Sequence, residues 1–154
     1  MEHPTGPPLV IARGGASAEA PEHTIAAFEA ALDEGADALS LRVRLSRDGH
    51  PVAFGPATLE RTTDGRGTVG ECTVRELKRL DAGGWKGLSF RGQRVQTLQE
   101  VLEAADVEQI RAAGLGCYVW TVNEPVLADR LVGWRVDGIL TDRPGLVRAR
   151  ISQT

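Results

Sequence analysis

The residues best suited to chemistry are arginines on a segment predicted to be a strand, residues 38–45. In this segment Ser40, Arg42 and Arg44 alternate with apolar residues. Successive side chains of a strand point to opposite faces, so the period of two predicts one apolar and one polar face. The polar face carries two guanidinium groups, which stay charged and donate several hydrogen bonds to anions such as phosphate. In a barrel or a parallel sheet, this face would point into the protein or at a ligand.

The sequence around this strand resembles the glycerophosphodiester phosphodiesterase family of TIM-barrel hydrolases, which act on lipid headgroups. The family strand has the pattern E-x-D-V, followed by K-D-G-x-P-V-V-F-H-D-P-T-L-x-R-T-T-D-G. Here S-L-R-V stands at residues 40–43, and R-D-G-H-P-V-A-F-G-P-A-T-L-E-R-T-T-D-G stands at 47–65. W-T-V-N at 120–123 and V-D-G-I-L-T-D-R-P at 136–144 are similar to the family's last two strands. The resemblance extends from Ile11 to Ala149.

The resemblance implies that the family's acid–base residues are replaced in this chain. The histidine and arginine of its H-R-G-A motif fall on Arg13 and Gly14, and its second histidine and the next aspartate fall on Gly55 and Pro56. General acid–base catalysis needs groups with pKa values near the working pH. Arginine stays protonated and glycine has no side chain, so neither replaces histidine.

The resemblance also implies that the metal-binding positions are replaced. The family's metal-binding glutamate and aspartate fall on Ser40 and Arg42. A third carboxylate belongs to an E-x-K strand that this chain lacks. A Mg²⁺ or Ca²⁺ site needs several oxygen ligands, mostly carboxylates, whereas Arg42 puts a positive charge where the cation would bind. We therefore predict no metal, no cofactor and no hydrolysis by the family's route.

Arg13 and Arg42 suggest another use for the same place. Both lie at the outgoing ends of adjacent predicted parallel strands, where ligands bind in such folds. Two guanidinium groups there would hold an anionic or phosphate-bearing small molecule directly, with Trp120 as an apolar wall. Alternatively, Glu22 or Asp142 pairs with one or both arginines, because an unpaired buried guanidinium is costly.

His23 is the one histidine near this predicted mouth, where the family has the asparagine of a P-E-N-T motif. It precedes Thr24, which is a predicted helix N-cap. We predict a structural role for His23 at the helix entry, with a catalytic role as the alternative. The candidate ligand-binding residues are Arg13, Glu22, His23, Arg42 and Trp120.

A series of β-α units has to position these residues. Apolar and alternating runs predict strands at residues 9–12, 38–45, 51–54, 117–122 and 138–141. N-caps at Thr24, Thr73, Thr97 and Asn123 each precede a predicted helix, and a last helix follows Pro144. Strands that alternate with helices are typical of the α/β class with parallel strands.

The length of the chain limits how much of a barrel it can build. It has 154 residues, whereas a complete (β/α)8 barrel takes about 250. After the helix that begins at Leu98, the family's middle β-α units are absent from the sequence. We therefore predict parallel β-α repeats forming a partial, half-like TIM barrel with roughly four core strands. The predicted domain covers residues 9–154 and follows a flexible leader at 1–8.

A partial barrel has open edges. In the family's barrel the last two strands neighbour the first two, which predicts the order 117–122, 138–141, 9–12, 38–45. Open edges invite pairing with another chain, and two such arcs related by a twofold axis would close an eight-stranded barrel. Self-association is therefore predicted, and the alternative to a ligand-binding function is a non-enzymatic structural or interaction module that associates through these edges. The alternative is an open sheet whose edge is covered by the 51–54 strand and the helix starting at Leu98.

Composition excludes several classes of partner and location. The net charge of −3 gives no large basic field for nucleic acid or a membrane surface. No apolar run approaches 18 residues, so no membrane span is predicted. The first ten residues lack the basic and apolar regions of a signal peptide, and we predict a cytoplasmic location.

Overall fold

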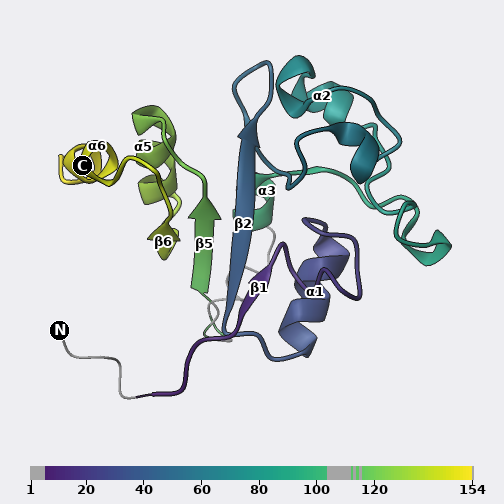
Figure 1. Cartoon of the computed structure of the whole chain (residues 1–154), viewed down its shortest axis with the longest axis horizontal. Helices are drawn as coiled ribbons and strands as arrows, with labels where there is room; N and C mark the ends of the chain where they lie inside the picture. Colours follow the sequence, from purple (N-terminus) through teal and green to yellow (C-terminus); the bar gives the residue numbers. More distant parts are fainter. Residues whose placement is uncertain (1–5, 104–111, 113, 115, 154) are drawn as a thin grey trace.

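The computed structural model describes residues 6–103, 112, 114 and 116–153 (Figure 1). The strands are β1 (Ile11–Arg13), β2 (Ala38–Leu45), β3 (Pro51–Ala53), β4 (Gln96–Thr97), β5 (Gly116–Trp120) and β6 (Gly138–Ile139). The helices are α1 (Ile25–Asp33), α2 (Val74–Leu77), α3 (Leu98–Glu103), α5 (Pro125–Gly133) and α6 (Pro144–Ile151). Three 3₁₀ turns occur at Leu59–Arg61, Val69–Glu71 and Leu88–Phe90. Residues 1–5 of the predicted leader, and most of the predicted helix after Glu103, lie outside the described residues.

Four of the strands are parallel and lie side by side in the order β1-β2-β5-β6. Arg42 of β2 lies opposite Trp120 of β5, and Tyr118 of β5 lies opposite Gly138 of β6. β3 runs antiparallel to the end of β2, and β4 runs antiparallel to β3. The predicted α/β class and the four parallel core strands are confirmed.

The predicted order of these strands is wrong. The prediction placed the 138–141 strand beside the 9–12 strand, but β5 pairs directly with β2, and β6 and β1 lie at opposite edges. The prediction assumed that the first and last strands meet, as they do in a closed barrel. In an open arc, each β-α unit instead places its strand next to the preceding one.

Two helix starts show how the sequence sets the ends of these elements. Thr24 caps α1, and its side chain accepts a hydrogen bond from the N–H of Ala27. Pro125 stands in the first turn of α5, as predicted, where its missing N–H matters little. The N-cap of α5 is Glu124 rather than the predicted Asn123. Asn123 instead bonds to Asp142 and Thr141 after β6, because these groups offer its amide both a donor and an acceptor.

The main core lies between one face of the parallel strands and the helices. Leu39 and Leu41 of β2 and Val119 of β5 are buried there against residues of α1, α3, α5 and α6. Leu45 was expected on this apolar face but is exposed, because β2 extends beyond the helices at this end. The 9–12 run was expected to be buried, yet residues 9–11 are exposed, because β1 is an edge strand with a neighbour on one side only.

The opposite face of the same strands carries different side chains. Strand register places Ile11, Arg13 and Ser40 on this face, together with Tyr118 and Trp120. All five are half-buried or exposed, whereas buried residues of α1, α3, α5 and α6 belong to the core on the other face. In a complete barrel this face would line the interior.

A second, smaller core lies beyond the end of β2. It joins β3 to the turns and short helix between residues 59 and 95. Its buried members are Val52, Phe54, Leu59, Val69, Leu77, Ala82 and Val95. This layer covers one side of the strand ends where the candidate site lies.

Among the described helices, none has the length and apolar character needed to cross a bilayer.

Candidate functional site

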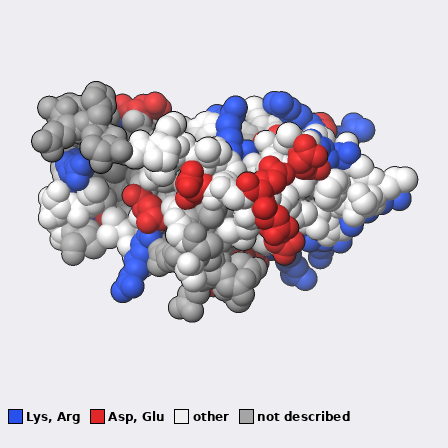
Figure 2. Space-filling model, turned by 90° about the horizontal axis from the view of Figure 1, so that it is seen from below, with Lys and Arg blue, Asp and Glu red and all other residues white. Residues whose placement is uncertain are grey.

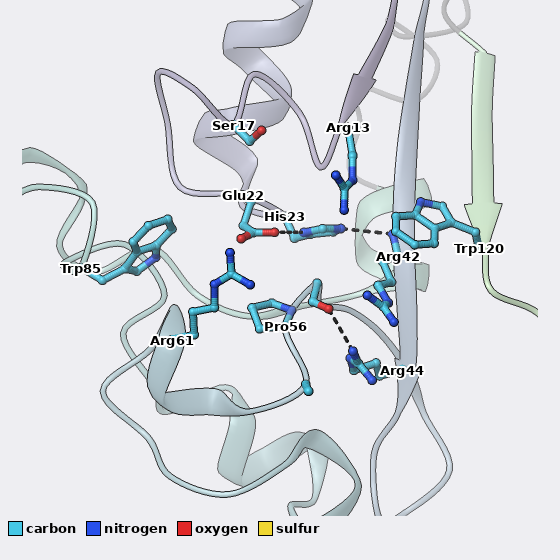
Figure 3. A pocket seen from close by; sticks show the side chains of 12 residues that line it. Arg13, Ser17, Glu22, His23, Arg42, Arg44, Pro56, Arg61, Trp85 and Trp120 are labelled. Carbon is cyan, nitrogen blue, oxygen red and sulfur yellow. Dashed lines mark hydrogen bonds and ion pairs between the residues drawn. The ribbon is translucent and has the colours of Figure 1, made fainter.

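A cavity of about 470 Å³ opens at the carboxyl ends of the parallel strands (Figure 3). It brings together all five candidate ligand-binding residues predicted from the sequence. Its lining consists of Arg13, Ser17, Glu22, His23, Arg42, Arg44, Gly55, Pro56, Ala57, Arg61, Trp85 and Trp120. Four arginines and one glutamate give the lining an excess of positive charge.

Arg13 and Arg42 share one aromatic partner. Strand register puts Arg13 opposite Ser40, and Arg42 opposite Trp120, so the three long side chains leave the same face of the sheet. The guanidinium carbon of Arg13 lies 5.5 Å from the centre of the Trp120 ring, and that of Arg42 lies 5.0 Å from it. These distances are within the range of cation–π attraction. Trp120 therefore orients two cations in addition to forming the predicted wall.

The expected alternative, a carboxylate paired with these arginines, is not found. Within the described part of the chain, no ion pair joins Arg13 or Arg42 to Glu22 or Asp142. Asp142 instead accepts a hydrogen bond from Asn123, 3.1 Å from its amide nitrogen. The two guanidinium groups thus line the cavity with cation–π contacts and, as far as the described residues go, without an ion pair.

His23 occupies the point where β1 stops following β2. Its Nε2 accepts a hydrogen bond from the backbone N–H of Arg42 at 3.1 Å. The carbonyl of Arg42 accepts a hydrogen bond from the N–H of Phe54, the residue that follows β3. Without His23, the Arg42 N–H would have no acceptor, because Arg42 lies between the part of β2 that pairs with β1 and the part that pairs with β3. Its ring nitrogen is therefore engaged in holding the backbone, which supports the predicted structural role at the helix entry.

The conformation of His23 suits this position. Its φ of 60° lies in the left-handed region, which asparagine, aspartate and histidine adopt more readily than most residues. The other ring nitrogen, Nδ1, lies 3.5 Å from a carboxylate oxygen of Glu22. This contact with His23, assisted by the charges of Arg61 and Arg13, lowers the pKa of Glu22 below its ordinary value, while partial burial opposes the shift. Glu22 is therefore held in its anionic form beside the arginines.

Two of the substituted family positions, Gly14 and Gly55, leave space for the side chains of Glu22 and His23. A Cβ on Gly14 would come within 2.9 Å of the His23 ring, and Gly14 also has a φ of +69°. A Cβ on Gly55 would come within 2.5 Å of the Glu22 carboxylate. The absence of side chains at these positions allows Glu22 and His23 to fill the floor of the cavity.

The sequence prediction did not include Arg44 and Arg61 among the candidate site residues. Arg44 follows Arg42 on the same polar face, and its Nη2 donates to the carbonyl of Gly55 at 3.0 Å. Burial, with repulsion from Arg42, lowers the pKa of Arg44. The alternation of residues 40–44 was the available signal for Arg44. Arg61 reaches the cavity from a 3₁₀ turn, and no sequence periodicity indicates that placement.

Two lining residues also carry buried donors. Arg44 Nε and Trp120 Nε1 are buried and have no hydrogen-bond acceptor among the described residues. Buried donors in native proteins nearly always have a partner.

The lining does not suit the divalent cation that the family's catalysis implies. The two family metal positions hold a hydroxyl on Ser40 and a guanidinium on Arg42. Across the described residues, no group of three or more histidine, cysteine, aspartate or glutamate side chains is arranged to hold a metal. Four arginines around the cavity would repel a cation, so we derive no chemical step through a metal here.

Comparisons with known proteins agree with this architecture. The model of the Glycerophosphoryl diester phosphodiesterase family matches residues 14–109 and 104–146. A glycerophosphodiester phosphodiesterase of Caldanaerobacter subterraneus subsp. tengcongensis is 50% identical over 95 residues, which cover 62% of this chain and 39% of that protein. The matched part thus spans about two fifths of that curated relative.

Solved structures show the same likeness. The crystal structure of a glycerophosphodiester phosphodiesterase from Agrobacterium tumefaciens aligns with a TM-score of 0.76 and 29% identity, over 94% of this chain and 64% of that one. An Oleispira antarctica phosphodiesterase in complex with its product, sn-glycerol-3-phosphate, aligns with a TM-score of 0.57 and 25% identity, over 94% and 97% of the two chains. With the family model matched along most of its length, this chain belongs to the glycerophosphoryl diester phosphodiesterase family.

Proposed function

We propose that this domain binds a phosphate-bearing small molecule in the arginine-lined cavity and does not hydrolyse it. The observation that carries the proposal is the pair of guanidinium groups of Arg13 and Arg42, which share Trp120 and form no ion pair among the described residues. Guanidinium groups bind phosphate through parallel charge-assisted hydrogen bonds. Both side chains line the same cavity beside Trp120 (Figure 3).

The absence of turnover follows from the chemistry of the same residues. An arginine cannot give up a proton to act as a base, and Gly14, Gly55 and Pro56 bring no titratable group to the family's catalytic positions. His23 has its Nε2 occupied by the Arg42 N–H. The domain therefore acts as a pseudoenzyme in this proposal, within the cytoplasmic location predicted from the sequence.

The proposed ligand class is glycerol phosphates and related headgroup fragments. The Oleispira antarctica relative is solved with sn-glycerol-3-phosphate, and the cavity here lies at the carboxyl ends of the strands, where ligands bind in barrels of this kind. A volume of about 470 Å³ accommodates a molecule of that size. This ligand class links the domain to glycerophospholipid metabolism.

Isothermal titration calorimetry with sn-glycerol 3-phosphate tests the binding proposal. Arg42→Gln and Arg13→Gln should each weaken binding about ten- to hundredfold, because each removes charge-assisted hydrogen bonds. Arg47→Gln is the matched control, since Arg47 is exposed and paired with Glu76. Glycerol, which lacks the phosphate, should not bind. Equal affinity of all three variants, or no heat of binding with the unmodified protein, would overturn the proposal.

An activity assay tests the second part of the proposal, the absence of hydrolysis. The purified domain is incubated with glycerophosphodiester substrates in Mg²⁺ or Ca²⁺, and product release is followed against a buffer blank. No turnover above the blank is expected. Reproducible product formation that Arg42→Gln abolishes would show that the cavity is catalytic after all.

A further inference from the structure

The arc of parallel strands ends in two edges with unused pairing capacity. The Val10 carbonyl accepts from Asp37, which precedes β2, and the Gly14 N–H donates to Ser40 of β2. The backbone groups of Ile11 and Arg13 therefore point to the outer side of β1. Leu140 directs its N–H to Val119 of β5, which leaves Ile139 pointing outward from β6. Among the described strands, none pairs with either outer side.

Exposed apolar side chains occur at both edges. At the β1 edge, Leu9, Val10 and Ile11 are 60%, 64% and 45% exposed. At the β6 edge, a groove of about 360 Å³ runs between β6 and α6 and is lined mainly by Ile139, Val147 and neighbouring residues. An exposed apolar ridge thus lies at one edge and an apolar groove at the other. Exposed apolar patches of this kind indicate an interaction surface.

The outermost helices carry opposite charges. α1 contains Glu29 and Asp33 and no basic residue. α6 contains no acidic residue and carries Arg148 and Arg150, of which Arg150 is paired with Asp129 of α5. Figure 1 places these helices at opposite ends of the arc. Figure 2 shows several acidic side chains on the face seen from below. Glu29 and Arg148 are each the fifth residue of their helix, and both are exposed.

We propose that two copies of this chain pair edge to edge, β1 of each with β6 of the other, around a twofold axis. The four parallel strands of each copy then form one closed eight-stranded barrel, a strand number whose interior side chains can fill. Closure pairs the outer backbone groups and seats residues 9–11 in the groove beside α6. It also buries the uncovered face that carries Ile11, Ser40 and Tyr118, and it places α1 against α6 of the other copy with opposite charges in contact.

The pairing also changes the setting of the candidate site. All eight strands of such a barrel run in the same direction, so both copies present their carboxyl ends at one end of the barrel. The two cavities with Arg13, Arg42 and Trp120 then share a single mouth. This follows from the strand directions and does not depend on which ligand the cavity binds, so failure of ligand binding leaves the pairing testable by itself.

Light scattering coupled to size-exclusion chromatography gives the first test. The unmodified chain should elute with twice the mass of one chain, and Val10→Lys should shift it to the mass of one chain. Val10 is exposed, so this lysine does not disturb the core. Leu88→Lys is the matched control, because Leu88 is 76% exposed and lies in a 3₁₀ turn away from both edges. A single-chain mass for the unmodified protein at every concentration, or a double mass for Val10→Lys, would overturn the proposal.

A charge-reversal experiment tests which edges meet. Glu29→Lys and Arg148→Glu should each weaken the dimer, since each places like charges together at both α1–α6 contacts. Mixed in equal amounts, the two variants should form heterodimers, because one contact is then native and the other is reversed in sign but still attractive. Glu124→Lys, on an exposed residue before α5, provides the control for a charge reversal elsewhere. Recovery in the mixture identifies the α1–α6 contact; no recovery contradicts it.

Discussion

His23 accepts the backbone N–H of Arg42 at the point where β1 has turned away and β3 has not yet begun to pair. His23→Ala removes this acceptor, so we expect the free energy of unfolding to fall by about 1–3 kcal/mol. His50→Ala, at an exposed turn position, should change it by less than about 0.5 kcal/mol. Urea denaturation followed by circular dichroism measures both, and equal stability of the two variants would contradict the backbone-holding role.

Glu22 makes the stability of the domain depend on pH in a predictable direction. The nearby His23 side chain lowers the pKa of Glu22 in the folded state. A lowered folded-state pKa contributes stability above the ordinary carboxyl pKa, and the contribution is lost as the pH falls through the lowered value. Glu22→Gln should therefore lose less stability than the unmodified protein between neutral and acidic pH.

The measurement is the difference in free energy of unfolding between these two proteins across a series of pH values. Glu19→Gln serves as the control, because Glu19 is exposed and lies in the same loop. A constant difference between Glu22→Gln and the unmodified protein would show that the carboxylate gains nothing from its surroundings.

Gly14 stands where the family has an arginine, and two features resist a side chain there. Its φ of +69° disfavours any other residue, and a Cβ would come within 2.9 Å of the His23 ring. We expect Gly14→Ala to lower the free energy of unfolding by about 1–2 kcal/mol from the backbone conformation alone. Gly49→Ala is the matched control, since Gly49 has a φ of +79° but open space around its Cα. A larger loss for Gly14→Ala measures the cost of crowding His23.

At the scale of elements, the N-cap of α1 determines how the segment with Glu22 and His23 enters the helix. The Thr24 hydroxyl accepts from Ala27 and donates to the carbonyl of Pro21. Thr24→Ala should cost about 0.5–2 kcal/mol of unfolding free energy. Thr58→Ala should cost less, because the Thr58 side chain makes no cap bond. Thermal unfolding of the two variants in parallel compares them directly.

The elements themselves were largely predictable because local chemistry sets them. Thr24 and Thr73 start helices where their hydroxyls can cap, and the alternation of residues 38–45 corresponds to β2. Residues Arg13, Arg42 and Trp120 meet because parallel strands end at one edge. Strand order was not predictable from local signals, since it depends on which strands are available to pair. The hydrogen bond from Arg42 to His23 was likewise not predictable, because it joins a strand to a loop that only the tertiary structure brings together.

At the scale of the whole molecule, edge pairing predicts a stability that depends on concentration. If two copies associate in the folded state and separate on unfolding, the midpoint of thermal unfolding rises with protein concentration. Val10→Lys should remove this dependence while leaving the dilute-solution midpoint unchanged. Scanning calorimetry over a range of concentrations measures it, and a midpoint independent of concentration for the unmodified chain would argue against a folded dimer.

The direct adjacency of β2 and β5 is what brings Arg42 and Trp120 together. Any relative with additional strands between these two would carry the tryptophan away from the second cation. The contact of two arginines with one indole ring therefore depends on the small number of strands in this chain. Introducing both arginines into a full-length homologue would reproduce the charges but not their shared contact with the tryptophan ring.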